Sequence, residues 1–431
     1  MRRWDLAVFV GVLLGPALLL GSCVALRQRT GDLEERLVRD STTVLSGSHP
    51  RMVHIGAARP GSFGDALAGH LPAIEKLAPA KAEELAPLRA VVAGDAPLSS
   101  LPPRFAELLA RAEPDLDAIL AGTRAERADL PVDRDAFMPV RGATWKGFQL
   151  TALLAGLRTR RALEASRAES AAAACLDGLA LGRDAALAGG LVGRMVQVEL
   201  SRRLVPPCAA AIGALPAGAA REALEQVRRI RDALPPFSTT LSEELVWVEL
   251  STYGPALAPS AAARLGPRAP AILAESTPSS FWARLALRDA WRDVRRHHDL
   301  LVGLAQLPPE ARDRAIEAAQ SKLTELLNPL AQVAPPYVHY ARRADAGRQL
   351  LDALALAAAA SIWSAENQSW PEDVELLASS GVLTDDEAER LDGAELEATE
   401  GAGGLVLTVP LPQGDAGGDP DQVTLHLPVS R

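Results

Sequence analysis

The chain has 431 residues, a net charge of −9, 48% apolar residues and only 4% aromatic ones. This length allows roughly two or three domains, and the apolar fraction is enough for a sizeable core. No block of like charge is long enough for a nucleic-acid arm, and the three cysteines are too few for a disulfide scaffold and too widely spaced for a zinc site. Ala and Leu, which favour helices, are abundant while strand-forming residues are sparse, so the predicted fold class is mainly α.

An uncharged run extends from Leu6 to Leu26, and Arg2 and Arg3 precede it. A helix over this run would measure roughly 31 Å, about the thickness of the hydrocarbon core of a bilayer. We therefore predict that residues 1–26 anchor the chain in a membrane.

A second interpretation of the same segment is a lipoprotein signal. The sequence Leu20-Gly21-Ser22-Cys23 resembles a bacterial lipobox, in which the cysteine is lipidated and becomes the mature N-terminus. The apolar run continues through residues 24–26, however, whereas mature lipoproteins usually continue with polar residues. The uncleaved transmembrane helix is favoured, and lipidation of Cys23 is the alternative.

The orientation of the anchor follows from the basic residues on its two sides. Four arginines lie within residues 27–39, against two before the run, so a strict count of Lys and Arg would not place the body outside. A very short basic N-terminal tail normally stays in the cytoplasm. On this ground we expect a single-pass or lipid-anchored bacterial membrane protein with an extracytoplasmic, periplasmic body.

Pro and Gly clusters divide the rest of the chain into segments. The predicted segments are a juxtamembrane and short-helix region (27–142), a helical-hairpin core (143–253), a Pro/Ala-rich linker (254–277), further helices (278–365) and a small α+β tail (366–431).

The helical-hairpin core contains successive helices with Leu-rich faces and short connections, which predicts antiparallel neighbours. This pattern resembles the stacked hairpins of tetratricopeptide-type solenoids, although no strict repeat recurs. Pro206-Pro207 is expected to end the third helix of the core, and Pro235-Pro236 the fourth. Before the tail, the helix over 340–365 is expected to be buried, and within the tail two short alternating segments, 405–409 and 423–427, predict a β-hairpin.

Three stretches resemble known sequences. PDLDAILAGTRAERADLPVD at 114–133 and AAACLDGLALGRDAALAGGLVGRMVQVEL at 172–200 resemble a set of uncharacterised bacterial proteins in which a membrane anchor precedes an Ala/Leu-rich helical region. LALAAAASIWSAENQSWPEDVELL at 354–377 resembles the C-terminal part of that set and is loosely similar to the soluble part of pseudopilins. The resemblance implies an anchored helical protein without a known active site, so it gives no residue a role. The chain lacks the Asp-Pro-Phe segment that the set usually has before its final hairpin.

Five arginines recur at short helical steps along the helix predicted over 278–304. This Arg ridge consists of Arg284, Arg288, Arg292, Arg295 and Arg296. Leu287, Val294 and Leu301 occupy the opposite arc, with Trp291 at the border. Such a ridge suits an anionic lipid, a glycan or an acidic protein partner. The alternative is an ordinary solvated face that neighbouring aspartates neutralise in part.

Motifs of the common enzyme classes, such as the G-x-S-x-G elbow, the Walker loop and H-E-x-x-H, are absent. The adjacent His297 and His298 diverge by about 100° on a helix, so they are expected to be solvated rather than to share a metal. Glu243, Glu244 and Glu249 are also expected to be solvated, although paired carboxylates can perform acid–base work. We therefore expect no enzyme activity, no cofactor and no metal.

Two other clusters contain residue types that bind metals. His49, His54 and His70 are expected to lie in or near a loop without a Cys or carboxylate frame. Aspartates crowd the predicted hairpin turn over 414–421, which is typical of a Gly/Asp-rich turn as well as of a Ca²⁺ ligand set.

The two remaining cysteines, Cys175 and Cys208, lie on or near successive predicted helices. In an oxidising compartment they would be able to pair as a disulfide. Buried free cysteines in an Ala-rich core are the equal alternative.

The function that these features favour is a membrane-anchored helical scaffold or protein-interaction module of the cell envelope. Its expected partners are the membrane and an envelope protein, without nucleic acid, and the sequence predicts no oligomeric state. The alternative is an envelope hydrolase with carboxylate acid–base chemistry. A deep pocket lined by carboxyl groups of raised pKa would favour that alternative.

Overall fold

The computed structural model describes residues 35–37, 39–40, 58–127, 142–252, 281–325, 336–399, 404–412 and 422–428. Within these ranges the protein is mainly helical, as the composition predicts, and it also contains a small antiparallel sheet of three strands. The predicted anchor (1–26), the linker (254–277) and the hairpin turn lie outside the described residues. Across the described ranges, no helix is both long enough and apolar enough to cross a membrane.

The region before the helical core begins and ends in a short strand. Its elements are β1 (Arg59–Ser62), α2 (Phe63–Leu77), η1 (Ala82–Leu85), α3 (Ala86–Ala93), η2 (Leu98–Ser100), α4 (Pro103–Gly122) and β2 (Ala125–Arg127). β1 and β2 pair in parallel, with Arg59 opposite Ala125, and thereby join the two ends of this region. The side chain of Ser62 accepts a hydrogen bond from the Gly64 amide at 3.1 Å and caps α2. The sequence does not predict β1 and β2, because strands of three or four residues are too short to show an alternating pattern.

The helical core follows the predicted order. Its helices are α5 (Gly142–Glu164), α6 (Ala168–Ala188), α7 (Gly190–Gly213), α8 (Ala217–Asp232) and α9 (Phe237–Thr252). The turn between α6 and α7 depends on two glycines. Gly190 has a positive φ of 54°, and a Cβ on Gly193 would lie 2.1 Å from the carbonyl oxygen of Ala185. Only glycine permits this close approach of the two helices.

The expected end of the third helix at Pro206-Pro207 is wrong. α7 continues through both prolines to Gly213, and Leu204, Val205 and Cys208 keep one continuous buried face. Prolines inside a helix remove backbone hydrogen bonds, but burial of the apolar residues on both sides outweighs that cost here. The break expected at Pro235-Pro236 is confirmed, because α8 ends at Asp232 and α9 begins at Phe237.

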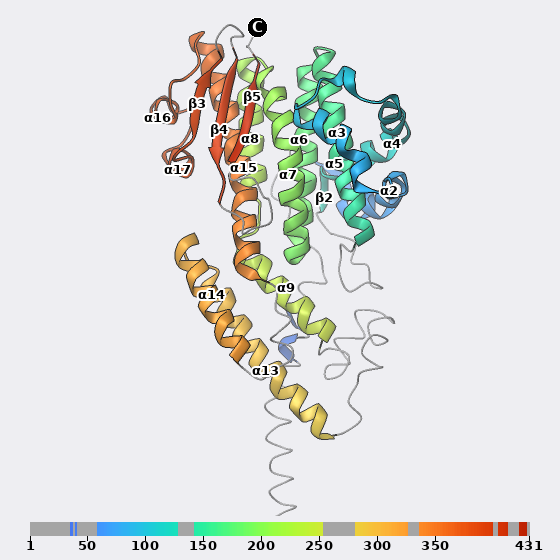
Figure 1. Cartoon of the computed structure of the whole chain (residues 1–431), viewed down its shortest axis with the longest axis vertical. Coiled ribbons are helices and arrows are strands. Elements are labelled where there is room, and N and C mark those ends of the chain that lie inside the picture. The colour runs from blue at the N-terminus through green and yellow to red at the C-terminus, as the bar shows by residue number, and fades with distance from the viewer. Residues whose placement is uncertain are drawn as a thin grey trace, which may run out of the picture.

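A late helix, α15 (Tyr337–Asn367), packs against α7 and α8 and completes the core (Figure 1). Its residues from 353 to 360 are fully buried, as the apolar run predicts. Most of these residues are alanines, which allow neighbouring helices to approach closely.

The tail packs a small sheet against α7 and α15. Its elements are α16 (Val374–Ser379), α17 (Asp385–Arg390), β3 (Glu395–Ala398), β4 (Leu405–Pro410) and β5 (Gln422–Leu427). Leu407 of β4 pairs with Leu425 of β5, so the predicted hairpin is confirmed. On its other edge β4 pairs antiparallel with β3, a strand that was not predicted, with Leu396 opposite Leu407.

A buried ion network fixes the tail on the core. Arg228 Nη2 donates to Glu387 Oε2 at 2.6 Å, and Arg231 Nη1 donates at 2.9 Å to both Glu387 Oε1 and Asp352 Oδ1. Burial alone would raise the pKa of Glu387, but the hydrogen bonds from the arginines and from the Thr384 amide outweigh it and hold the pKa at about 2. α17 is thereby attached to α8 and α15.

The remaining helices lie toward the other end of the long axis of the molecule (Figure 1). They are α13 (Phe281–Leu304), which packs with α9, and α14 (Pro309–Glu325), which packs with α13 and α15. We call α9, α13, α14 and residues 35–40 the arm, and the other described elements the body. The predicted helices over 278–304 and 309–332 correspond to α13 and α14, although residues 326–335 lie outside the described ranges.

Candidate functional site

The Arg ridge is not one continuous exposed face. The backbone of Arg284 and Arg288 lies on α13, but their side chains are outside the described part of the structure. Of the other three, Arg292 is half-buried, Arg295 is 12% exposed and Arg296 is 72% exposed. The expected facing of this helix is therefore wrong at Arg295, which turns toward α9.

Arg295 can be buried because two carboxylates neutralise it. Its Nη2 donates to Asp40 Oδ2 at 2.6 Å, and its Nη1 donates to Glu249 Oε1 at 2.9 Å. Burial alone would lower the pKa of Arg295, but these two partners outweigh it and raise that pKa. The guanidinium thus links α13 to α9 and to the segment that precedes the body in sequence.

Glu249 is the centre of this cluster. Its side chain is 1% exposed, and besides Arg295 it accepts a hydrogen bond from Trp291 Nε1 at 3.0 Å. His298 Nδ1 lies 3.8 Å from Glu249 Oε1. Trp291 is fully buried rather than at the border of the ridge, and His298 is buried rather than solvated. Glu249 was expected to be solvated, and that expectation is wrong.

A hollow of about 230 Å³ opens beside this cluster. Arg36, Asp40, Ser242, Arg295, His298 and Asp299 contribute its polar lining. Ser, His and carboxylate groups are the residue types of nucleophilic hydrolases, whose signature is a hydrogen bond between nucleophile and base. Among the described residues, Ser242 and His298 form no such bond, and the charged groups of the hollow are already paired with one another.

Residues 35–40 are held against α13 by a second contact. Arg36 Nη2 lies 3.3 Å from Asp299 Oδ1, and both side chains are about half exposed. Together with the contact between Asp40 and Arg295, this pair forms what we call the clasp. Within the arm, the clasp joins the segment that follows the predicted anchor to α13.

Two further glutamates of α9 are buried at the N-terminus of α7. Glu244 Oε2 accepts from the Leu191 amide at 3.2 Å, and Glu243 interacts with the Gly190 amide. Burial raises the pKa of both, that of Glu243 to about 8, because a charged carboxylate loses its hydration there. Both were expected to be solvated, and that expectation is wrong. Neither residue lines the hollow beside Glu249.

The other candidate ligands remain apart. His70 Nδ1 lies 2.8 Å from Asp115 Oδ1, while His49, His54 and the aspartates of the hairpin turn lie outside the described ranges. Within those ranges no group of three or more His, Cys, Asp or Glu side chains is arranged to hold a metal ion. Burial, with a contribution from His298, lowers the pKa of His297 to about 4.

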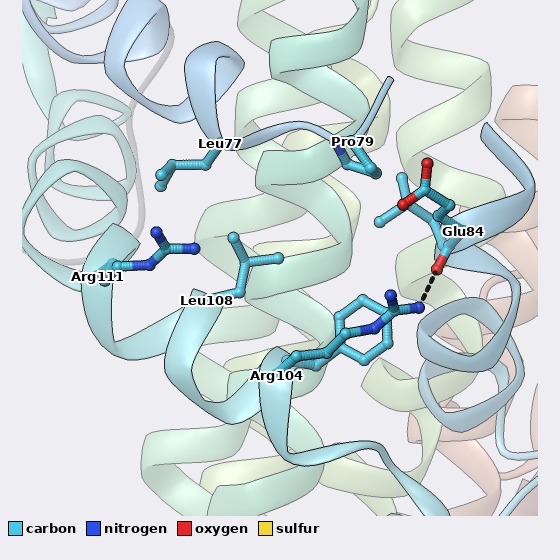
Figure 2. Close-up of a pocket in the computed structure, with 8 residues that line it drawn as sticks. Leu77, Pro79, Glu84, Arg104, Leu108 and Arg111 are labelled. Carbon is cyan, nitrogen blue, oxygen red and sulfur yellow. Dashed lines mark hydrogen bonds between the residues drawn. The ribbon is translucent and has the colours of Figure 1, made fainter. Parts of the chain in front are cut away.

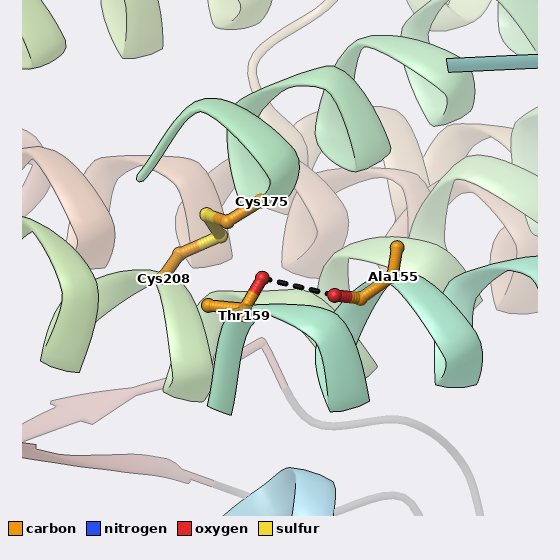
Figure 3. The surroundings of a disulfide bond; sticks show 4 residues. All are labelled: Ala155, Thr159, Cys175 and Cys208. Atoms are coloured by element: carbon orange, nitrogen blue, oxygen red, sulfur yellow. Dashed lines mark hydrogen bonds between the residues drawn. A yellow bond between two sulfur atoms is a disulfide. The ribbon is translucent and has the colours of Figure 1, made fainter. Parts of the chain in front are cut away.

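Cys175 on α6 and Cys208 on α7 form a disulfide in the structure, with their Cα atoms 5.5 Å apart (Figure 3). The bond lies in the body, next to α5, where Thr159 Oγ1 donates to the carbonyl oxygen of Ala155 at 2.9 Å. Cys23, the predicted lipidation residue, lies outside the described residues.

No family model matches the chain, and no curated protein or solved structure is significantly similar to it.

Proposed function

We propose that the chain is a membrane-anchored helical scaffold that holds an interaction surface at a fixed place relative to the membrane. The observation that carries the proposal is the clasp. Its ion pairs, Arg36 with Asp299 and Asp40 with Arg295, attach the segment after the predicted anchor directly to α13. A tethered body without such contacts would swing freely on its linker.

The length of the chain limits how far the arm can lie from the membrane. Residues 27–35 separate the predicted anchor from the clasp, and nine residues reach at most about 30 Å when fully extended. The arm is thus the membrane-proximal end, and the body is directed away from the membrane.

The disulfide supports an extracytoplasmic body. Cytosolic thiols are kept reduced, whereas structural disulfides persist in oxidising compartments such as the periplasm. The bond between Cys175 and Cys208 is buried within the body, where a structural role fits better than a transient one.

The helical hairpins suit a scaffold, but not as an open solenoid. In a solenoid each repeat contacts only its neighbours, whereas α15 packs on α7 and α8 from far along the chain. The interaction surface of this scaffold is therefore the outside of a closed bundle and not a concave inner face. The hydrolase alternative is not proposed, because Glu243 of α9, whose pKa is raised to about 8, packs against the start of α7 and does not line the hollow beside Glu249.

The test is a distance measurement on the full chain reconstituted in liposomes. A fluorophore is introduced as an unnatural amino acid either at Leu300, which is half exposed beside the clasp, or at Arg229, which is exposed on α8 of the body. With energy acceptors on the lipid headgroups, we expect much stronger energy transfer from position 300 than from position 229. Equal transfer from the two positions, or stronger transfer from position 229, would contradict the proposal.

A further inference from the structure

A second hollow lies in the body, between α4 and the segment that joins α2 to η1 (Figure 2). Its lining includes Leu77, Pro79, Glu84, Arg104, Leu108 and Arg111. The volume is about 140 Å³, similar to an engineered protein cavity of roughly 150 Å³ that holds one benzene molecule. The hollow therefore suits one aromatic or large aliphatic side chain.

Two cations flank the apolar floor of this hollow. Arg104, Leu108 and Arg111 follow one another at helical spacing on one face of α4, so Leu108 lies between the two guanidinium groups (Figure 2). The Cα atoms of the two arginines are about 10.5 Å apart along the helix axis by the rise per residue. Both arginines are exposed, and within the described chain neither forms an ion pair with a carboxylate.

The two arginines differ in how firmly they are held. Arg104 Nη2 donates to the backbone oxygen of Glu84 at 3.2 Å, and its guanidinium lies 4.9 Å from the centre of the Phe105 ring. For Arg111, no side-chain contact of this kind occurs among the described residues. Arg104 is thus pre-oriented for an anion, while Arg111 is free to adapt to one.

The wall of the hollow that lies opposite α4 carries a negative charge. Glu84 belongs to η1, and its Oε1 accepts a hydrogen bond from the Lys81 amide at 3.3 Å. A ligand that carries carboxylates must therefore direct them toward α4 and away from Glu84.

We propose that the hollow and the two arginines beside it, together called the groove, bind an extended acidic segment of a protein partner. An apolar side chain of that segment occupies the hollow, and its carboxylates bind Arg104 and Arg111. In an extended chain, alternate residues point to the same side, and positions i and i+4 are about 13 Å apart. A Glu-x-Phe-x-Glu pattern would thus place its three side chains over Arg104, Leu108 and Arg111. Arginine suits this role because its planar guanidinium binds a carboxylate through two hydrogen bonds.

This inference rests on the proposed function, because it specifies the partner of the interaction module. An anionic lipid surface would also offer apolar chains and negative groups, as the acidic peptide does. The position of the groove in the molecule disfavours a lipid ligand. α4 lies in the upper part of the body in Figure 1, far along the long axis from residues 35–40, and the proposed function puts the membrane at that other end.

The test uses the full chain in detergent micelles and fluorescent synthetic peptides with the Glu-x-Phe-x-Glu pattern. Two control peptides replace both glutamates with glutamine, or the phenylalanine with alanine. We expect the parent peptide to bind about tenfold more tightly than either control, and the difference from the glutamine peptide to shrink at high salt. Equal affinity for the parent and glutamine peptides would overturn the proposal.

Variants of the groove separate its contributions. Arg104→Gln together with Arg111→Gln should weaken binding of the parent peptide about tenfold, and Glu84→Gln should strengthen it about twofold. Arg229→Gln, at an exposed arginine of α8 with no ion pair in the described chain, is the matched control and should leave binding unchanged. All of these are surface changes, and circular dichroism should show unchanged helicity.

Two outcomes would overturn the assignment. One is an unchanged affinity in the double arginine variant. The other is displacement of the peptide by a short-chain phosphatidylglycerol at equal concentration, which would assign the groove to lipid. If the peptide experiment fails, the result of the energy-transfer experiment on the clasp still stands. If the energy-transfer experiment fails but the peptide binds specifically, only the membrane-proximal placement of the arm is removed.

Discussion

The body and the arm are stabilised by different interactions. In the body, α15 buries a continuous run of Ala and Leu from 353 to 360 against α7 and α8. In the arm, the contact between α9 and α13 contains Glu249, Arg295 and His298 beside its apolar residues. Apart from the ion network around Glu387 that attaches the tail, the body therefore depends mainly on apolar packing, whereas the arm buries charges that must stay paired among its apolar residues.

This difference has an energetic consequence. Apolar burial does not depend directly on pH, whereas a buried charge is tolerated only while its partner is present, because its hydration has been lost. α14 meets α15 through charges as well, since Arg312 Nη2 lies 2.8 Å from Asp345 Oδ2. We expect the contacts of the arm to open before those of the body when the pH or the salt concentration changes.

The largest expected effect is in the arm. Glu249→Gln leaves Arg295 and His298 buried without this carboxylate, so we expect a loss of about 4 kcal/mol in local stability. Hydrogen exchange of the α13 amides should accelerate accordingly, while the α7 amides should not change. Asp293→Asn, which removes an exposed carboxylate from the same helix, is the control and should change stability by less than about 0.5 kcal/mol. Similar exchange in the two variants would show that the cluster does not stabilise the arm.

The second expected effect is in the body. Replacing both Cys175 and Cys208 by alanine removes a link across 33 residues, and we expect the free energy of unfolding to fall by about 3 kcal/mol. Urea denaturation measures this, with reduced wild-type protein as the comparison. Mass mapping without reductant, on protein from its native compartment, should recover the linked peptides. Two free thiols there would contradict both the disulfide and the extracytoplasmic placement.

The smallest expected effect is a pH dependence of the arm. The pKa of Glu243 is about 8 in the folded protein, above its usual value of 4.5, so the folded state binds more protons between these values. The free energy of opening should therefore fall by roughly 2 kcal/mol as the pH rises from about 6 to about 7.5, and it should level off above about pH 9. Glu243→Gln should remove most of this slope in exchange measurements on α9, whereas Glu83→Gln, at an exposed glutamate of η1, should retain it. A slope that persists in Glu243→Gln would assign the titration to another group.

Much of the helical order was predictable because periodicity and proline breaks are local. The charged cluster was not, because its members come from three distant segments. One local signal did exist: Glu249 follows Leu241 and Leu245 at four-residue steps and so shares their buried face. In the same way, His298 lies between Val294 and Leu301 in the apolar pattern of α13. A charged residue on an apolar stripe predicts a buried partner elsewhere in the chain.

The Arg ridge shows the limit of reading one helix alone. Five arginines on one arc look solvated when only their own helix is considered, yet Arg295 has Glu249 and Asp40 as partners from other segments. The groove on α4 was missed for the opposite reason. Its arginines lie on an ordinary amphipathic helix. They line a hollow only because Leu77 and Glu84 form the opposite wall.

The late return of α15 affects how the protein is made. Arg194 Nη2 on α7 donates to the carbonyl oxygen of Ala344 at 3.0 Å, across 150 positions of the chain. At a synthesis rate of 5–20 residues per second, roughly 8–30 s pass between the two ends of this contact. During that interval the face of α7 that α15 later covers has no partner. A nascent chain of this topology needs protection from aggregation until its last third has emerged, and its core closes late because so many of its contacts are distant in sequence.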